Sequence, residues 1–164
     1  MIIQYRHTQI GYMVIIPIGI VLFIIIALFM LIASSIYNRW IIFPGFIFTI
    51  IFSVIILLFY RLTVIVTDDN LEVRFGIGLV HKRFPLKDID HVQIVKNPWY
   101  FGWGIHLTPH GWLYNISGFD AVQIKTISGK SFRIGTDDPA GLEMAIRQVK
   151  EIIKQNESNL ILWR

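Results

Sequence analysis

Two long apolar runs near the N-terminus constrain this chain more than any other feature. Thr8–Asn38 contains no charged side chain, Trp40–Tyr60 contains none either, and Arg39 stands alone between them. The hydrocarbon core of a bilayer is about 30 Å thick, and a helix needs about 20 apolar residues to cross it. We therefore expect a hairpin of two transmembrane helices, with spans at about residues 10–36 and 41–60.

A cleavable signal peptide is the alternative explanation of the first run, because the small residues Ala33–Ser35 resemble a cleavage site. The apolar region of a signal peptide is about 7–15 residues long. This run is longer, and a second run follows it at once. Both segments are therefore expected to be retained, with residues 1–61 forming an N-terminal transmembrane anchor.

The charges that flank the hairpin predict its orientation. Arg6 and Arg61 lie at its two outer ends, whereas Arg39 is the one cation of the connecting loop. Because cytoplasmic flanks are enriched in Lys and Arg, we expect a multi-pass protein of the cell membrane with both termini in the cytoplasm. Tyr37 and Trp40 flank Arg39 as an interfacial aromatic belt would.

The spans themselves contain no ionisable residue, which argues against a carrier or pump, because such proteins usually need one. The second span carries small side chains at four-residue spacing, at Gly45, Thr49 and Ser53. Small residues let another helix backbone approach closely. The stripe predicts either packing within the hairpin or a homo-oligomer seam through the second span.

Composition excludes several functional classes. The chain has no Cys, which rules out disulfides, Cys-zinc sites and thiol nucleophiles. Its net charge of +4 comes largely from the membrane flanks, because residues 62–164 carry twelve Lys or Arg against all eleven acidic residues. A nucleic-acid-binding domain would show a clustered basic stripe, so no nucleic-acid partner is expected.

The sequence changes character after residue 61. Short runs rich in β-branched residues and separated by turn residues predict seven strands, at 62–67, 71–75, 79–84, 91–96, 112–116, 120–127 and 131–136. A helix should follow, with Asp138 as its N-cap and Pro139 in its first turn. We expect an α+β domain over residues 62–155, a small curved sheet or open barrel whose end this helix covers, and then a tail at 156–164.

Three segments carry a family resemblance: "FPLKDIDHVQIVKNPW" (Phe84–Trp99), "GWGIHLTPHGWLYNISG" (Gly102–Gly118) and "IGTDDPAGL" (Ile134–Leu142). Together with the order of elements, they resemble the pleckstrin-homology (PH) superfold over about residues 62–155. More specifically, the chain is similar to the bacterial PH-like domain membrane proteins, in which this domain follows two membrane spans. The resemblance implies a seven-strand open barrel of two sheets, capped by the C-terminal helix.

One departure from the PH pattern concerns lipid binding. PH domains that bind phosphoinositides place Lys and Arg around the first strand-to-strand loop, where charge-assisted hydrogen bonds hold the phosphates. Here that loop contains Asp68 and Asp69, which argues against headgroup recognition of that type. Lys82, Arg83 and Lys87 are candidate lipid-headgroup contacts near a membrane surface.

No catalytic, cofactor or metal site is expected. His81, His91, His106 and His110 have no Cys and no dense carboxylate cluster around them. Asp137 and Asp138 are better explained by helix capping than by acid-base chemistry, because Pro139 follows them. The chain is therefore predicted not to be an enzyme.

The segment Asn97–Asn115 concentrates aromatic side chains among Pro and Gly. In one interpretation Trp99, Phe101 and Trp112 fold inward and plug the barrel, and the Gly residues of tight turns favour it. The segment could instead lie at the headgroup level of the bilayer or form a protein-binding surface. The candidate interface residues are Trp99, Tyr100, Trp103, Trp112 and Tyr114.

These inferences predict a membrane-anchored, non-catalytic PH-like scaffold or protein-interaction module at the cytoplasmic membrane face, with a protein partner that the sequence does not identify. The alternative is direct binding of anionic lipid headgroups or a small ligand by the PH-like domain. Salt-dependent binding to anionic vesicles would favour the alternative.

Overall fold

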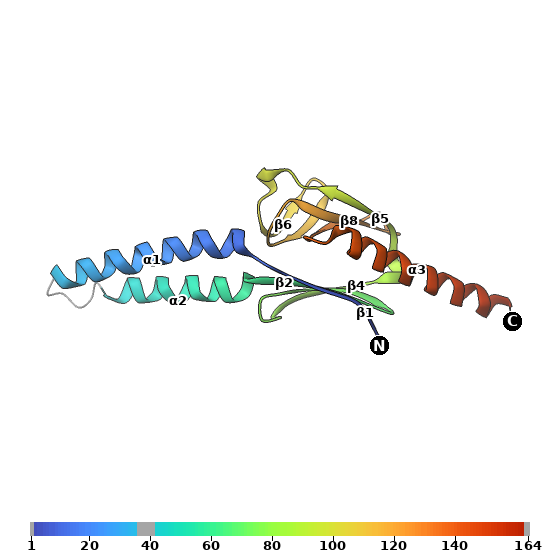
Figure 1. Cartoon of the computed structure of the whole chain (residues 1–164), viewed down its shortest axis with the longest axis horizontal. Coiled ribbons are helices and arrows are strands. Elements are labelled where there is room, and N and C mark those ends of the chain that lie inside the picture. Colours follow the sequence, from blue (N-terminus) through green and yellow to red (C-terminus); the bar gives the residue numbers. More distant parts are fainter. Residues whose placement is uncertain (1, 36–41, 163–164) are drawn as a thin grey trace.

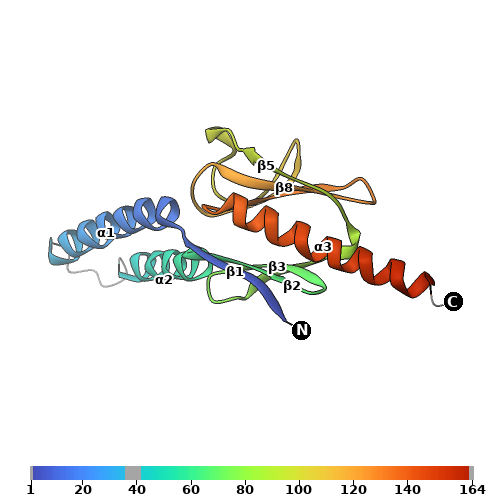
Figure 2. The same cartoon turned by 45° about the vertical axis from the view of Figure 1, so that its right-hand side comes forward.

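The computed structural model describes residues 2–35 and 42–162. Helices α1 (Tyr12–Ser35) and α2 (Ile42–Phe59) lie side by side and extend from one end of a domain made of two β-sheets (Figure 1; Figure 2). Helix α3 (Pro139–Leu162) packs across that domain. The predicted α+β class, with two sheets and a C-terminal helix, is confirmed.

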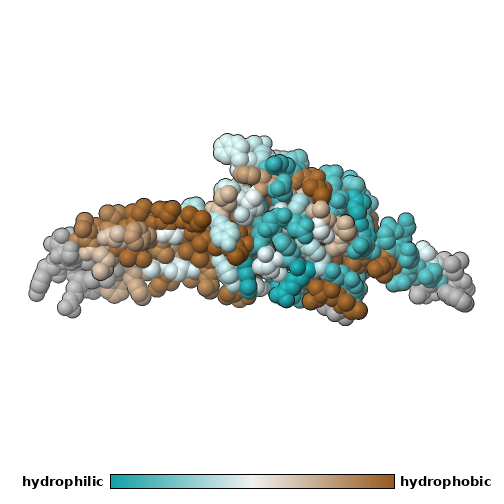
Figure 3. All heavy atoms as spheres, viewed as in Figure 1, coloured by the Kyte–Doolittle hydropathy of each residue, from teal (hydrophilic) through white to brown (hydrophobic). Residues whose placement is uncertain are grey.

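Helices α1 and α2 are apolar on all sides, and Figure 3 shows them as the most hydrophobic part of the molecule. Within the described residues, Tyr12–Ile32 is the one helix long and apolar enough to cross a membrane, judged by length and composition. Phe43–Phe59 forms a shorter apolar helix. The predicted interfacial residues Tyr37, Arg39 and Trp40 lie outside the part of the chain that the structure describes.

Sheet A contains four antiparallel strands in the order β1-β2-β3-β4, namely Ile3–Ile10, Arg61–Thr67, Asn70–Phe75 and Val80–Pro85. Strand β1 precedes α1, so residues that we grouped with the membrane anchor belong to the sheet. Its side chains alternate as a half-buried strand requires. Tyr5, His7 and Gln9 face inward, and the intervening side chains are exposed.

Sheet B contains five strands in the order β5-β8-β9-β7-β6. In chain order they are Ile89–Lys96, Gly104–Thr108, Gly111–Asn115, Asp120–Thr126 and Ser131–Gly135. The neighbours are antiparallel except β7 and β9, which run parallel. The described residues thus form nine strands where we expected seven, because β1 and β6 were not predicted.

The helical elements agree better with expectation. A 3₁₀ turn, η2 (Leu86–Asp88), connects the two sheets, and a second one, η3 (Trp99–Phe101), lies in the aromatic segment. Asp138 caps α3 as predicted, because its carboxylate Oδ1 accepts the Gly141 N–H at 3.0 Å. The helix continues through residues 156–162, which we expected to be a tail.

The hydrophobic core lies between the two sheets and is closed by α3. Burial of its aliphatic and aromatic surface is the main force that holds the layers together. Residues with at most 1 % of their surface exposed come from both sheets, from η2 and from α3, and include Phe75, Leu71, Leu86, Ile116, Ile124, Ile134, Leu142 and Ile146.

Candidate functional site

The junction between the helices and the domain has no linker. Only Gly11 separates β1 from α1, and only Tyr60 separates α2 from β2. The Gly11 N–H donates to the Tyr60 carbonyl oxygen at 2.9 Å, so the two single-residue connections between helix and strand are hydrogen-bonded to each other. A side chain at Gly11 would meet Ile116 of the core at 2.6 Å. The β1–β2 pair therefore continues the helical pair directly and fixes the orientation of the domain relative to it.

The β3–β4 turn packs against the end of α2. The Gly76 N–H donates to the Arg61 carbonyl oxygen at 2.8 Å, and a Cβ at Gly76 would collide with the carbonyl groups of Leu57 and Leu58. Two apolar side chains of this turn project outward, with Ile77 51 % and Leu79 72 % exposed. The turn thus presents apolar surface beside the helix end.

The aromatic turn η3 lies at the same end of the domain but across it, on sheet B. Figure 1 and Figure 2 show it, in yellow-green, at the top of the domain end from which α1 and α2 extend. Trp99 is 77 % exposed and Tyr100 69 % exposed, whereas the Phe101 ring lies over the buried Arg133 guanidinium with a ring-centre distance of 5.9 Å. Burial lowers the pKa of Arg133. Trp and Tyr are the side chains that favour the headgroup level of a bilayer.

The other aromatic candidates are placed differently. Tyr114 is buried in the core, edge-on to Phe84, and burial raises the pKa of its phenol. Trp103 is half-buried, and its indole N–H donates to the Gly118 carbonyl oxygen at 3.2 Å. Trp112 is 49 % exposed at the edge of the inner face. The interpretation of Trp99 and Trp112 as inward plugs is therefore wrong, because Tyr114 fills that place.

The three cationic candidates do not lie together. Strand alternation directs Arg83 to the outer face of sheet A, where its Nε lies 2.8 Å from a carboxylate oxygen of Glu72. Lys82, one residue earlier, lines an apolar hollow with Trp112 on the other face. Lys87 in η2 lies beside α3. Closeness along the sequence therefore did not show that these three cations lie on different faces of the domain.

A larger basic feature lies on the outer face of sheet A, in a hollow of about 410 Å³ that we call the arginine hollow. Its floor is formed by buried side chains of the central strand β2, Thr63, Ile65 and Thr67. Its rim carries four arginines, one from each strand of the sheet: Arg6, Arg61, Arg74 and Arg83.

Glu72 is the one acidic residue in the lining of the arginine hollow, and its side chain is 2 % exposed. One carboxylate oxygen lies 2.5 Å from Arg74 Nη2, and the other 2.8 Å from Arg83 Nε. A buried carboxylate held by two guanidinium groups is well compensated. With four arginines against this one glutamate, the lining has a net charge of +3.

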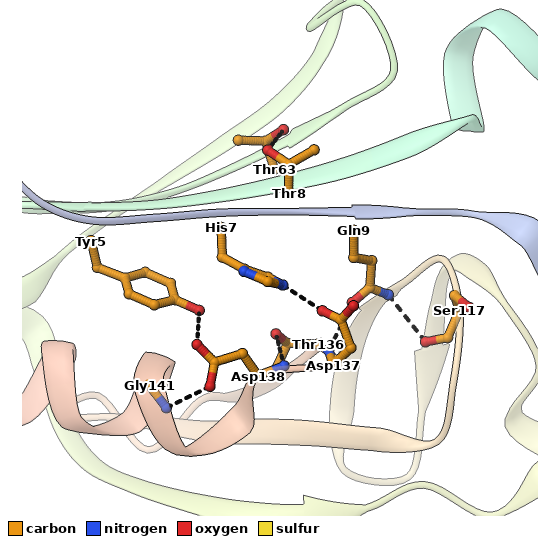
Figure 4. A network of polar contacts seen from close by, with 10 residues as sticks. All are labelled: Tyr5, His7, Thr8, Gln9, Thr63, Ser117, Thr136, Asp137, Asp138 and Gly141. Atoms are coloured by element: carbon orange, nitrogen blue, oxygen red, sulfur yellow. Dashed lines mark hydrogen bonds and ion pairs between the residues drawn. The ribbon is translucent and has the colours of Figure 1, made fainter.

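Strand β1 is fastened to the start of α3 by a polar network that Figure 4 shows from close by. The Tyr5 hydroxyl donates to Asp138 Oδ2 at 3.1 Å, and His7 Nε2 lies 2.5 Å from Asp137 Oδ1. Gln9 accepts the Asp137 backbone N–H at 3.0 Å and donates to the Ser117 carbonyl oxygen at 3.1 Å. The sequence predicts only a capping role for the two aspartates. The alternate positions of Tyr5, His7 and Gln9, which place the three side chains on one face of a strand, are the signal that could have indicated the contact.

The small-residue stripe of α2 packs within the helical pair in part. Gly45 is buried, and a Cβ there would lie 2.5 Å from the ring of Phe29 on α1. The Thr49 hydroxyl donates to the Gly45 carbonyl oxygen at 2.9 Å, and Ser53 is exposed. Gly45, the first residue of the stripe, therefore allows close packing of α2 against α1.

Across residues 2–35 and 42–162, no group of three or more His, Asp or Glu side chains is placed to hold a metal ion. Comparison with protein-family models, curated proteins and solved structures found no match to this chain.

Proposed function

We propose that this chain is a two-span protein of the cell membrane that presents a non-catalytic PH-like domain to a protein partner at the cytoplasmic face. The observation that carries the proposal is the pairing of β1 with β2. One strand precedes α1 and the other follows α2. Their pairing requires both ends of the helical pair to be on one side of a membrane, and two crossings satisfy this requirement.

The surfaces of α1 and α2 support insertion in a bilayer. A helix that is apolar on all sides belongs in a protein core or in a membrane, and these two lie outside the domain core. Large apolar side chains such as Phe23 (73 % exposed) and Phe46 (64 % exposed) project from them. In water, a patch of this size would drive aggregation.

The PH-like assignment is supported by the architecture of two sheets around one core with a C-terminal helix across it. Two features depart from the family pattern of seven strands. Strand β1 is supplied from before the membrane helices, and β7 runs parallel to β9. The assignment therefore rests on the arrangement of layers and the three segments quoted above.

A partner surface is available on the β6–β7 hairpin. Leu107 (69 % exposed) is the cross-strand neighbour of Trp112 (49 % exposed), and the two side chains share a face. Exposed Trp next to an aliphatic side chain is typical of interface hot spots. Because no linker joins the domain to the helices, a partner would meet this surface at one fixed orientation to the membrane.

Single-cysteine labelling tests the topology cleanly, because the natural chain has no Cys. We expect Gln4→Cys and Lys154→Cys to react with an impermeant maleimide only after intact cells are opened. Labelling of the two positions from opposite sides would contradict the hairpin, and labelling of both in intact cells would contradict the cytoplasmic orientation.

Affinity capture from detergent extracts tests the partner. We expect specific proteins to be retained by the wild type and lost with Leu107→Ser/Trp112→Ser, while Lys125→Gln, an exposed change on β8, retains them. Identical background lists from all three chains would contradict a protein-interaction role.

A further inference from the structure

We propose that the arginine hollow binds the phosphate group of an anionic phospholipid from the bilayer that holds α1 and α2. This inference rests on the membrane anchoring proposed above and adds a ligand class and a site to it. The site is formed by Arg6, Arg61, Arg74 and Arg83, and three of these differ from the cations that the sequence suggested.

Unmatched positive charge is the first argument. Glu72 binds Arg74 and Arg83 with separate oxygens. Among the described residues, no carboxylate forms an ion pair with Arg6 or Arg61. Guanidinium groups bind phosphate through paired N–H donors, and the fork geometry makes Arg better suited than Lys to this task.

Strand register brings these side chains to one place. Arg74 lies opposite Thr63 on β2, while Arg6 and Glu72 flank Ile65, and Arg83 lies opposite Glu72. The four guanidinium groups thus come from four strands of one face. Glu72, beneath them, fixes two of them in position and leaves the net charge at +3.

Position relative to the helices is the second argument. Arg61 directly follows Tyr60 at the end of α2, and Gly76–Gly78 line the same end of the hollow. Ile77 and Leu79 project from that turn as exposed apolar side chains. One end of the hollow therefore lies where the hydrocarbon of a bilayer would begin.

The spacing along the strands fits a phospholipid headgroup. The headgroup layer adds roughly 5–8 Å to each side of the hydrocarbon core. Thr63 and Ile65 follow Arg61 at about 7 and 13 Å along β2, at 3.3 Å per residue. Arg61 and Arg74 therefore lie within the depth of the headgroup layer, and Arg6 and Arg83 form a second row farther from the helices. The arginine hollow thus extends from the headgroup layer outward.

This site is distinct from the loop in which PH domains hold phosphoinositides. The β2–β3 turn lies at the opposite end of β2, and the Asp68 carboxylate there accepts the Ile2 N–H and the Gln4 side-chain amide. Those hydrogen bonds lower the pKa of Asp68 and keep it negative. A free phosphate ion shares the chemistry of the headgroup, but the position of the hollow beside the end of α2 favours the lipid.

Native mass spectrometry of the full chain in dodecyl maltoside tests the proposal. The probes are palmitoyl-oleoyl phosphatidylglycerol, the matching phosphatidylcholine and inorganic phosphate. We expect one phosphatidylglycerol to bind per chain at least about tenfold more tightly than phosphatidylcholine, and Arg6→Gln and Arg83→Gln each to weaken it about tenfold. Equal affinity for the two lipids would overturn the proposal.

A further variant sharpens the test. Lys125→Gln removes a cation outside the hollow and should leave affinity unchanged. A loss with Lys125→Gln equal to that with Arg83→Gln would show a general charge effect and overturn the site.

The remaining outcomes separate the ligand source and the two proposals. Inorganic phosphate that displaces phosphatidylglycerol at equal molarity would assign the hollow to a soluble anion and overturn the lipid. Arg6 and Arg83 are exposed, so their variants should fold, which the same melting temperature would confirm. A labelling pattern that places Gln4→Cys and Lys154→Cys on opposite sides contradicts the proposed membrane anchor. A chain with the expected labelling pattern but no preference for phosphatidylglycerol contradicts only the lipid site in the arginine hollow.

Discussion

The Tyr5 hydroxyl donates to Oδ2 of Asp138 at 3.1 Å, while Oδ1 of the same carboxylate accepts the Gly141 N–H that begins α3. One side chain therefore caps the C-terminal helix and binds the strand that precedes α1. The start of α3 cannot shift without disturbing β1, so the two ends of the chain are coupled through Asp138.

Tyr5 should make stability depend on pH in the alkaline range. Burial is the main cause that raises the pKa of the Tyr5 phenol, followed by its hydrogen bond to Asp138 and the negative charges of Asp138 and Asp137. The unfolded phenol ionises near pH 10. A raised folded-state pKa contributes stability that is fully present below about pH 10 and is lost as the pH rises toward the folded value.

We therefore expect the melting temperature of the wild type in detergent to fall more steeply above about pH 10 than that of Tyr5→Phe. At neutral pH the variant should lose about 1 kcal/mol through the missing hydrogen bond. Circular dichroism across pH 8 to 11 measures both effects. Parallel pH profiles for the two chains would contradict this role of Tyr5.

Gly76 and Gly78 form a matched pair in the β3–β4 turn, since both have positive φ, of 52° and 93°. Ala at Gly78 would meet open space, whereas at Gly76 it would collide with carbonyl groups at the end of α2. We expect Gly78→Ala to cost about 1 kcal/mol and Gly76→Ala about 3 kcal/mol or more. Chemical denaturation in detergent measures the difference. Equal losses of stability in the two variants would show that the turn does not pack against α2.

Trp99 should lie at the headgroup level of the bilayer. In a chain with the other four Trp replaced by Phe, we expect lipids brominated high on the acyl chain to quench its fluorescence. The control is a Trp-free chain carrying Ile127→Trp, because Ile127 lies beside η2 at the end of the sheets remote from α2. Its fluorescence should persist. Equal quenching of the two would contradict the seating of η3 on the membrane.

Gly45 and Gly19 test the contact between α1 and α2. A Cβ at Gly45 would press into the Phe29 ring, while Gly19 has nothing within 4 Å. We expect Gly45→Ala to destabilise the helical pair by about 1–2 kcal/mol. Gly19→Ala should be neutral or slightly stabilising, because Ala has the higher helix propensity. Unfolding in sodium dodecyl sulfate measures both. A reversed order would place the packing face elsewhere.

Local signals in the sequence predicted the elements that depend on local interactions. Asp138 and Pro139, for example, predicted the start of α3. Strand β6 was missed because Gly104 and Pro109 interrupt its neighbourhood, and only its register with β7 makes it a strand. Propensity is a weak guide where pairing decides the outcome.

Strand β1 was also missed because its pairing, and not its local sequence, makes it a strand. Its partner, β2, follows two complete helices in the sequence, so nothing near Tyr5 or His7 indicates a pairing. The arginine hollow could not be found either, because Arg6, Arg74 and Arg83 meet only through the register of sheet A. Sequence proximity instead grouped Lys82 with Arg83, which point to opposite faces.

The pairing of β1 with β2 also sets an order of events during synthesis. Residues 3–10 are made before α1 and α2, whereas the strand that pairs with them is made only after these helices. In the topology that we propose, the N-terminal segment would remain unpaired and on the ribosomal side while the hairpin enters the bilayer. Correct insertion would then be a checkpoint for folding, because a chain whose helices failed to turn back would keep the two strands apart and leave the core of the domain open.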